Sequence, residues 1–321
     1  MLASFAGSAV SYAGTIRHDR PDTSYRSLAS QSQFAGVGHY SAGTVYGSFT
    51  LIAPNWGLTA AHVVDVNANG QLDDTFTNDV LTIGGQQRTV TQAIVPVGIN
   101  GNRGWNGNIN AGFDIALVRF DTPFDDDIKP ASIYTGFQEL GKTITQVGYG
   151  STGNGQTGSY LSGGRSSKRA GNNMVDRYVN FSNGATALRW DFDEAGGPSP
   201  NQSGSTNPLD LEYLIAGGDS GGGSFIFENN AWYLAGVHSG TYNAYLYPDS
   251  PTAPDDAEDG STYGDESLVT RVAAYQDFIF NSIPELAVAV PEPSSLALLG
   301  LAGLLSRAGG AERLLCRHSF E

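Results

Sequence analysis

The chain has 321 residues, with 32 Asp and Glu against 17 Lys and Arg, and a formal net charge of -15. This charge repels phosphate backbones, so we expect no nucleic-acid partner. Hydrophobic residues make up 40% of the chain and glycine fills 42 positions, a composition typical of a globular, turn-rich, all-β protein rather than a helical one.

The single cysteine, Cys316, excludes an intrachain disulfide, so the hydrophobic core alone must hold the fold. Residues 1–13 are small and weakly apolar. Ser11 and Ala13 stand at the two positions that a signal peptidase reads, which predicts the end of a signal peptide. The alternative is a disordered terminus. Residues 14–33 are expected to form an N-terminal segment ahead of the folded domain.

From residue 34 to residue 150, short β-rich runs alternate with turn residues. The predicted strands are Val45–Ile52, Val90–Val97, Ile115–Phe120 and Thr143–Val147. The stretch over residues 148–173 is rich in Gly, Ser and Asn and predicts a surface loop.

A second β-rich group follows this stretch. Its predicted strands are Tyr178–Phe181, Ala187–Phe192, Ser224–Phe227 and Trp232–His238. Asn229 and Asn230 favour a tight hairpin between the last two strands, because asparagine tolerates positive φ. Residues 248–266 predict an exposed acidic loop. Apolar residues at helical spacing then predict one amphipathic closing helix; they are Val269, Val272, Tyr275, Phe278, Ile279 and Ile283.

Three segments carry residue types that suit nucleophilic catalysis. His62 follows the small and apolar residues 58–61, which let the backbone pack tightly while the imidazole points into a cleft. Asp114 stands directly before a continuous apolar strand, where a partly buried carboxylate needs a donor such as an imidazole N–H. Ser220 lies within residues 217–223, whose glycines allow a tight turn and the close approach of a substrate carbonyl.

Serine is a poor nucleophile at neutral pH unless a base lies within hydrogen-bond reach and a third group orients that base. Ser220, His62 and Asp114 are the candidates for these three catalytic roles. The N–H groups of Gly218 and Ser220 are the candidate donors to the negative oxygen of a tetrahedral intermediate. Taken singly, these residues also suit a structural histidine, a turn aspartate and a flexible glycine linker.

Residues 58–62, 114–117 and 218–222 resemble the three motifs of chymotrypsin/trypsin-type serine peptidases, in that family's order of His, Asp and Ser. Other segments resemble the turn that opens the second barrel, the substrate-pairing strand and the closing helix; they are residues 147–150, 234–240 and 270–279. The resemblance covers residues 34–284 and implies a protease domain over residues 34–285. That domain would be all-β: two packed six-stranded antiparallel β-barrels, over residues 34–135 and 136–285, with a C-terminal α-helix. The lack of disulfides points to a bacterial version.

The resemblance also implies where substrate binds. Ser239, Gly240 and Thr241 would pair with the substrate backbone as an added strand. Leu214 would lie at the floor of the primary pocket, with Ser267 and Thr241 at its walls. An aspartate at the floor would select Arg or Lys, so Leu214 predicts cleavage after apolar or small residues.

Zymogens of this family are activated when the aspartate before the serine pairs with a newly formed N-terminus. Asp219 stands at that position. A chain starting at Ile16 is the candidate partner, although the residues after Ile16 do not match the usual activation site.

One loop resembles the first half of a calcium-binding loop, with oxygen-bearing side chains at alternate positions around a glycine. The candidate ligands are Asp65, Asn67, Asn69 and Asp73. Phe76 stands where a full loop has a carboxylate, so Asp74 or Asp79 would have to substitute. The alternative is a polar turn, and the reaction itself would require no cofactor.

Residues 290–321 resemble a PEP-CTERM sorting tail, with a Pro-Glu-Pro motif, apolar residues 296–305 and then Arg307. In such a tail the apolar run pauses in the membrane while the cations stay inside. The resemblance implies an exosortase-type processing partner and a secreted or cell-surface location, in the extracellular matrix of a Gram-negative-type bacterium. The run is short and residues 308–321 follow it, so the alternative is a short apolar helix packed on the domain.

Together, these segments predict a secreted serine endopeptidase that hydrolyses protein or peptide substrates through an acyl-enzyme. The alternative is a catalytically idle surface-binding protein on a protease scaffold.

Overall fold

The structure is a computed structural model that describes residues 14–72, 76, 78–98, 104–160, 167–181, 184–196, 204, 207–242 and 261–288. The predicted signal peptide, the sorting tail, Asp73 and most of the predicted acidic loop lie outside these residues. The chain divides into one unit up to Phe278 and a second unit from Ile279 onward. All of the described strands belong to the first unit.

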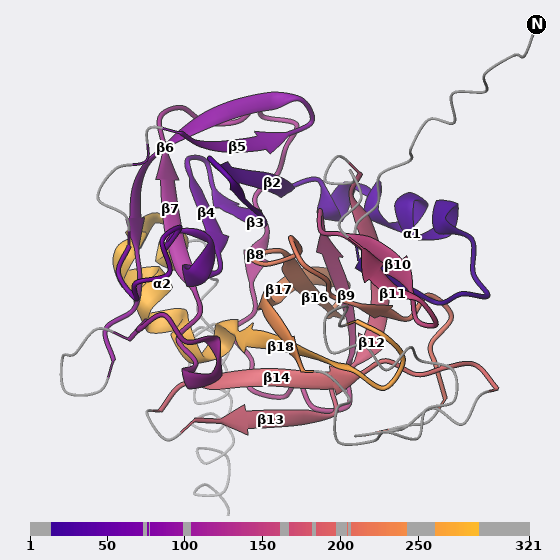
Figure 1. The fold of residues 1–321 in the computed structure, drawn as a ribbon. Coiled ribbons are helices and arrows are strands. Elements are labelled where there is room, and N and C mark those ends of the chain that lie inside the picture. Colours follow the sequence, from indigo (N-terminus) through magenta and orange to yellow (C-terminus); the bar gives the residue numbers. More distant parts are fainter. Residues whose placement is uncertain are drawn as a thin grey trace, which may run out of the picture. The chain divides into compact units, whose positions relative to one another are not determined.

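The first half of the chain forms a closed barrel with the strand order β2-β3-β4-β7-β6-β5 (Figure 1). Its strands are β2 (Val37–Ala42), β3 (Val45–Ala53), β4 (Trp56–Thr59), β5 (Asp79–Ile83), β6 (Gln86–Ile94) and β7 (Ala116–Phe120). Neighbouring strands all pair antiparallel. Phe49 stacks on Phe124, and Leu58 and Leu117 are buried. Closure satisfies every strand edge, so the loops at each end of this barrel start from fixed positions.

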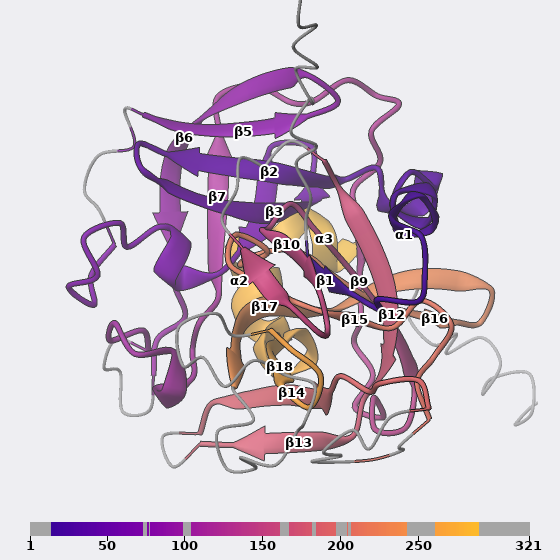
Figure 2. The same cartoon turned by 45° about the vertical axis from the view of Figure 1, so that its right-hand side comes forward.

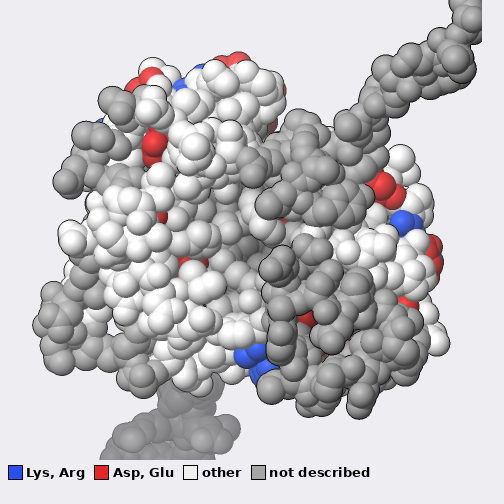
Figure 3. Space-filling model, viewed as in Figure 1, with Lys and Arg blue, Asp and Glu red and all other residues white. Residues whose placement is uncertain are grey.

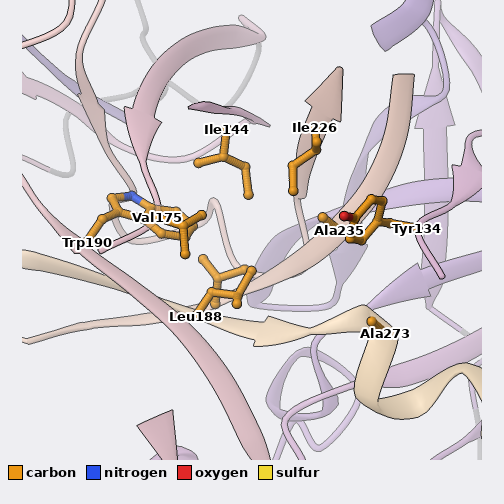
Figure 4. Close-up of a cluster of buried hydrophobic side chains, with 9 residues drawn as sticks. Tyr134, Ile144, Val175, Leu188, Trp190, Ile226, Ala235 and Ala273 are labelled. Carbon is orange, nitrogen blue, oxygen red and sulfur yellow. The ribbon is translucent and has the colours of Figure 1, made fainter. Parts of the chain in front are cut away.

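The second half forms a sheet with the order β12-β9-β16-β17-β18-β14-β13, and β8 (Ser132–Ile133) adds a parallel pair with β17. Its other strands are β9 (Thr143–Gly148), β12 (Arg169–Met174), β13 (Arg177–Asn180), β14 (Thr186–Asp191), β16 (Gly223–Glu228), β17 (Ala231–Tyr242) and β18 (Glu266–Arg271). Ile144, Leu188, Trp190 and Ile226 belong to one buried cluster (Figure 4). The predicted all-β architecture is confirmed, with one closed six-stranded antiparallel barrel. The second predicted barrel is instead an eight-stranded sheet, in which the pair of β8 and β17 is parallel.

A small third sheet has the order β11-β10-β1-β15, built from β1 (Gly14–Ile16), β10 (Thr152–Asn154), β11 (Gly158–Tyr160) and β15 (Tyr213–Leu214). Figure 2 shows β1 beside β10 and β15. The prediction of a surface loop over residues 148–173 is wrong at β10, at β11 and at all but the last residue of β12. Glycine allows the backbones of β10 and β11 to lie close together there, since a Cβ at Gly153 would lie 1.6 Å from the Gly158 carbonyl oxygen.

The N-terminal segment contains α1 (Asp22–Ala29) and a 3-10 turn, η1 (Ser32–Phe34). Tyr25 on α1 and Phe34 on η1 are fully buried. Phe34 packs against Phe225 and Trp232 of the second sheet. This segment therefore packs into the same core as the second sheet rather than forming a separate extension.

The single closing helix that was predicted is three shorter pieces. Val269 belongs to β18, and a 3-10 turn, η5 (Val272–Tyr275), precedes α2 (Gln276–Ser282). The last described element is α3 (Pro284–Val288). Proline lacks an amide N–H and fits the first turn of a helix, so Pro284 ends one helix and starts the next. None of the described helices is long and apolar enough to cross a membrane.

The hairpin at Asn229 and Asn230 is confirmed, because both residues have positive φ, 51° and 62°. On the face drawn in Figure 3, most of the described residues are uncharged and the Lys, Arg, Asp and Glu side chains are scattered. The described surface on this side therefore presents no large field of one sign.

Candidate active site

His62 and Asp114 are brought together by the pairing of two barrel strands. β4 ends at Thr59, which pairs with Ala116 at the start of β7. His62 lies in the 3-10 turn η2 (Ala61–Val63) that follows β4, and Asp114 comes two residues before β7. Because the strands are antiparallel, the end of one and the start of the other meet at the same rim of the barrel.

The Asp114 carboxylate is fully buried and accepts three hydrogen bonds. Its Oδ1 accepts the backbone N–H of His62 at 3.0 Å, and its Oδ2 lies 2.7 Å from His62 Nδ1. The Ser239 hydroxyl donates to Oδ2 at 2.6 Å, and the Thr270 hydroxyl donates to the Asp114 backbone carbonyl at 2.8 Å. A carboxylate accepts but does not donate, so Nδ1 carries the proton and Nε2 is the basic nitrogen of the neutral ring.

Two opposing effects set the proton affinity of His62. Burial disfavours the imidazolium form, whereas the charge and the hydrogen bond of Asp114 favour it, and Asp65 adds in the same direction. The net effect raises the pKa of His62 above its ordinary value of 6.5. The side chain is 29% exposed, so the ring can meet a substrate.

This shift predicts the pH dependence of hydrolysis. The sequence predicts that His62 is a general base, which must be unprotonated, so kcat/KM should fall as pH decreases through the pKa of His62. We expect the midpoint of this acid limb to lie above 6.5, because Asp114 stabilises the protonated ring. A pH profile of kcat/KM for a neutral peptide measures it, and a midpoint below the ordinary histidine value would contradict this assignment.

Ser220 lies in a turn that is seated against the segment carrying His62. Gly221 has φ +84°, and a Cβ there would lie 3.0 Å from the backbone nitrogen of Ala60. The Ser220 carbonyl accepts the N–H of Ser48 at 2.7 Å. The Ser220 side chain is half-buried, and its hydroxyl makes no hydrogen bond within the described part of the chain. A hydrogen bond between a catalytic hydroxyl and its base is often long in the free enzyme and shortens when substrate binds.

Two hydrogen bonds to carbonyl groups fix the direction of the Gly218 and Ser220 N–H groups. The C=O and N–H of one trans peptide point to opposite sides. The carbonyl that shares a peptide with the Gly218 N–H accepts the Ser151 N–H at 2.6 Å, and the Asp219 carbonyl accepts the Gly222 N–H at 2.8 Å. Neither the Gly218 nor the Ser220 N–H has an acceptor among the described residues, so both can bind an oxyanion.

Two buried residues that the sequence analysis left without a role support this turn. His238 Nδ1 donates to the Asp219 carbonyl at 3.2 Å, and its Nε2 accepts the Ser224 hydroxyl at 3.0 Å. Burial lowers the pKa of His238 to about 3, so this ring is neutral. The Ser48 hydroxyl donates to the Gly218 carbonyl at 3.1 Å. Neither residue stands in a catalytic motif, so a signal for these roles exists only in the folded chain.

The predicted substrate-pairing residues lie on β17. Gly240 and Thr241 pair with β18, whereas Ser239 is skipped at a register shift. Beyond His238, no described strand pairs with the other side of β17. The predicted substrate backbone would add to this edge as a strand. Ser239 has a second role that the sequence analysis missed, since its hydroxyl holds Asp114.

The two other predicted pocket residues are fully buried. Leu214 packs with Phe192 and Tyr263. The Ser267 hydroxyl donates to Gln146 Oε1 at 3.2 Å. Phe192, Tyr263 and Gln146 are uncharged side chains, and the substrate preference stays a prediction.

The predicted calcium loop is held by its own hydrogen bonds. The Asp65 carboxylate accepts the N–H groups of Asn69 and Gly70 at 3.1 and 2.9 Å and the Trp105 indole N–H at 2.8 Å. The Asn67 side chain accepts the Asn69 N–H at 3.1 Å. Within the described residues, no group of three or more His, Cys, Asp or Glu side chains could hold a metal ion. The polar-turn alternative accounts for these contacts, and calcium binding stays a prediction.

A model of the PEP-CTERM protein-sorting motif matches residues 289–313 and indicates an exported, secreted or cell-surface protein. None of the curated proteins compared matches the chain. Among solved structures, 1262 chains match. One of them is described as the structure of Glu endopeptidase in complex with MPD and is 18% identical to this chain, with a TM-score of 0.49. The match covers 79% of this chain and 94% of that chain. A model described as Trypsin matches residues 29–249, more than half of the chain, and the chain therefore belongs to the trypsin family.

Proposed function

We propose that this protein cleaves peptide bonds through an acyl-enzyme formed on Ser220, with His62 as general base and Asp114 as its orienting partner. Membership of the trypsin family makes the chain a serine-type endopeptidase. The observation that supports the residue roles is the 2.7 Å contact between His62 Nδ1 and Asp114 Oδ2. This contact leaves His62 Nε2 as the basic nitrogen, at the rim of the first barrel that the Ser220 turn contacts.

Each step follows from a group already in place. His62 Nε2 accepts the Ser220 hydroxyl proton while Oγ attacks the substrate carbonyl carbon. The charge that forms on the carbonyl oxygen is received by the N–H groups of Gly218 and Ser220. Asp114 stabilises the imidazolium, which then gives its proton to the leaving amine. A water molecule then attacks the carbonyl carbon of the acyl-enzyme in the same way. His62 takes the proton of the water and returns it to Ser220 Oγ, and the carboxylic acid product leaves.

The substrate is a protein or peptide, and we propose that it is cut after apolar or small residues. Leu214 stands where a charged residue would select a charged partner, and its packing neighbours Phe192 and Tyr263 carry no charge at neutral pH. The open edge of β17 at Ser239 and Thr241 would bind the substrate backbone by strand addition. Main-chain recognition of this kind tolerates many sequences, so the pocket would set the choice of bond.

A peptide library with every residue type at the cleavage position tests both statements. The expected result is hydrolysis by the wild-type protein, concentrated after apolar or small residues. A clear preference for Arg or Lys would overturn the role of Leu214, whereas no hydrolysis of any member would favour the catalytically idle scaffold. A Ser132→Ala variant, altered at an exposed serine of β8, is the matched control and should retain the wild-type profile.

The sorting tail and its match over residues 289–313 support an exosortase-type enzyme as processing partner. We propose a location at the cell surface or in the extracellular matrix of a Gram-negative-type bacterium. An exported protein meets an oxidising environment, in which disulfides can form. Cys316 is the single cysteine of this chain, so its fold forms without an intrachain disulfide.

A further inference from the structure

Asp219 directly precedes the proposed nucleophile and takes no part in proton transfer. Its side chain is fully buried. Oδ1 accepts the Gly150 N–H at 2.8 Å, and Oδ2 accepts the Ala216 N–H at 3.0 Å and the Tyr213 hydroxyl at 3.1 Å. A buried carboxylate without donors is costly, so these three contacts fix the side chain. They thereby fix the backbone of the turn that contains Ser220.

Tyr213 is itself held in a tight, fully buried setting on β15. Gly14 has φ +66°, and a Cβ there would lie 2.0 Å from the Tyr213 hydroxyl oxygen and 1.9 Å from ring atom Cζ. A Cβ at Gly171 would lie 2.4 Å from Tyr213 Cβ. Glycine at both positions leaves room for the ring, so the hydroxyl reaches Asp219 in one direction. Gly14, the first described residue, therefore lines the space that the Tyr213 ring occupies.

The N-terminal strand β1 lies directly beside Tyr213. Ile16 pairs with Asn154 on one side and with Tyr213 on the other, and its carbonyl accepts the Gly155 N–H at 3.0 Å. These pairs hold Ile16 inside a sheet. Among the described residues, the donors to the Asp219 carboxylate are two backbone N–H groups and a neutral hydroxyl, and none is a chain terminus.

We propose that Tyr213 is a positioning residue, which holds Asp219 and through it the turn of Gly218 and Ser220 in its catalytic shape without a new N-terminus at Ile16. The inference rests on the proposed peptidase function and adds to it a means of activation. Tyr213 contacts no reacting atom, so its effect passes through Asp219. The N-terminal strand supports the active site by packing against Tyr213 rather than by carrying a charge.

The groups that face Asp219 come from three elements: Tyr213 on β15, Arg169 on β12 and His238 on β17. Burial raises the pKa of Asp219 to about 6, and the backbone donors, the Tyr213 hydroxyl and Arg169 act in the opposite direction. His238 is neutral. Removing the tyrosine hydroxyl would therefore raise the pKa of Asp219 further, and its ionised form would be lost at a higher pH.

The test is the full-length Tyr213→Phe variant, assayed for kcat, KM and the pH profile on a peptide that the wild type cleaves. One hydrogen bond to an ionised acceptor corresponds to a loss of about 10- to 100-fold, which we expect in kcat with KM nearly unchanged. The acid limb of kcat/KM, which His62 governs in the wild-type protein, should move to higher pH and become steeper, because Asp219 then takes up a proton in the same pH range. A residue that merely supported folding would lower the melting temperature and leave this limb in place.

Tyr25→Phe is the matched control. It removes another buried hydroxyl, which donates to the Glu212 carbonyl at 3.1 Å, from a ring packed against Tyr213. This variant should keep the wild-type acid limb. If Tyr213→Phe fails to fold, Gly14→Ala replaces it, because the added Cβ pushes the ring from Asp219 and should give the same shift.

The outcomes separate this inference from the function on which it rests. If the wild-type protein is active and the folded Tyr213→Phe or Gly14→Ala variant keeps the wild-type acid limb of kcat/KM, the inference is overturned and the proposed function stands. Wild-type protein that cleaves nothing overturns both. Intact mass gives a second arm: activity in chains that still contain residues before Ile16 agrees with the proposal. Activity that arises only after cleavage between Thr15 and Ile16 would overturn it.

Discussion

The Ser220→Ala variant should lose peptide hydrolysis by roughly 10⁶-fold in kcat, the scale known for removal of the serine from a triad on another fold. The substitution deletes the atom that would form the acyl-enzyme and leaves the turn intact. Ser220 is half-buried and its hydroxyl has no partner among the described residues, so the melting temperature should stay near that of the wild type. Steady-state rates and thermal melts measure the two effects separately.

Ser132→Ala is the control for this variant and should be fully active. Residual hydrolysis by purified Ser220→Ala within tenfold of the wild type would mean that another group is the nucleophile. A loss of activity together with a large fall in melting temperature would instead mean that Ser220 is needed for the fold.

The Asp114→Asn variant should lose about 10⁴-fold in kcat, as expected for this triad in general. The amide can donate to Nδ1, which favours the tautomer with the proton on Nε2 and leaves no base facing Ser220. The imidazolium also loses the charge that stabilises it. KM should change little, because Asp114 is fully buried and is not placed to touch substrate.

The matched control is Asp125→Asn, at an aspartate of the first half whose side chain is 71% exposed. It should leave kcat and the pH profile unchanged. A fall in kcat of less than tenfold in folded Asp114→Asn would contradict the orienting role of this carboxylate.

The parts of the fold that follow from local pattern were predictable. Alternating and apolar runs located β3, β7, β9 and β14 within one or two residues, and the Asn229 hairpin followed from its tolerance of positive φ. The three motifs were sufficient to name the family. His62 and Asp114 meet because β4 pairs with β7, and sequence spacing alone does not contain that pairing.

The predictions failed where a local signal had a second meaning. Glycines in residues 148–173 indicated a loop, yet Gly153 allows two strands to approach closely. The spacing that predicted one closing helix spans the end of the strand β18, the 3-10 turn η5 and the short helix α2. Residues that support the site from behind, such as Ser48 and Tyr213, lie outside its three motifs. Their roles come from tertiary contacts, which no local pattern encodes.

The most direct measurement of the central claim is the site of covalent capture by a fluorophosphonate probe, which reacts with a serine activated by a neighbouring base. The protein should gain one adduct, which peptide mapping assigns to Ser220, and labelling should be lost in Ser220→Ala and strongly slowed in Asp114→Asn. Folded wild-type protein that gains no adduct, or gains one on a different serine, would contradict the account.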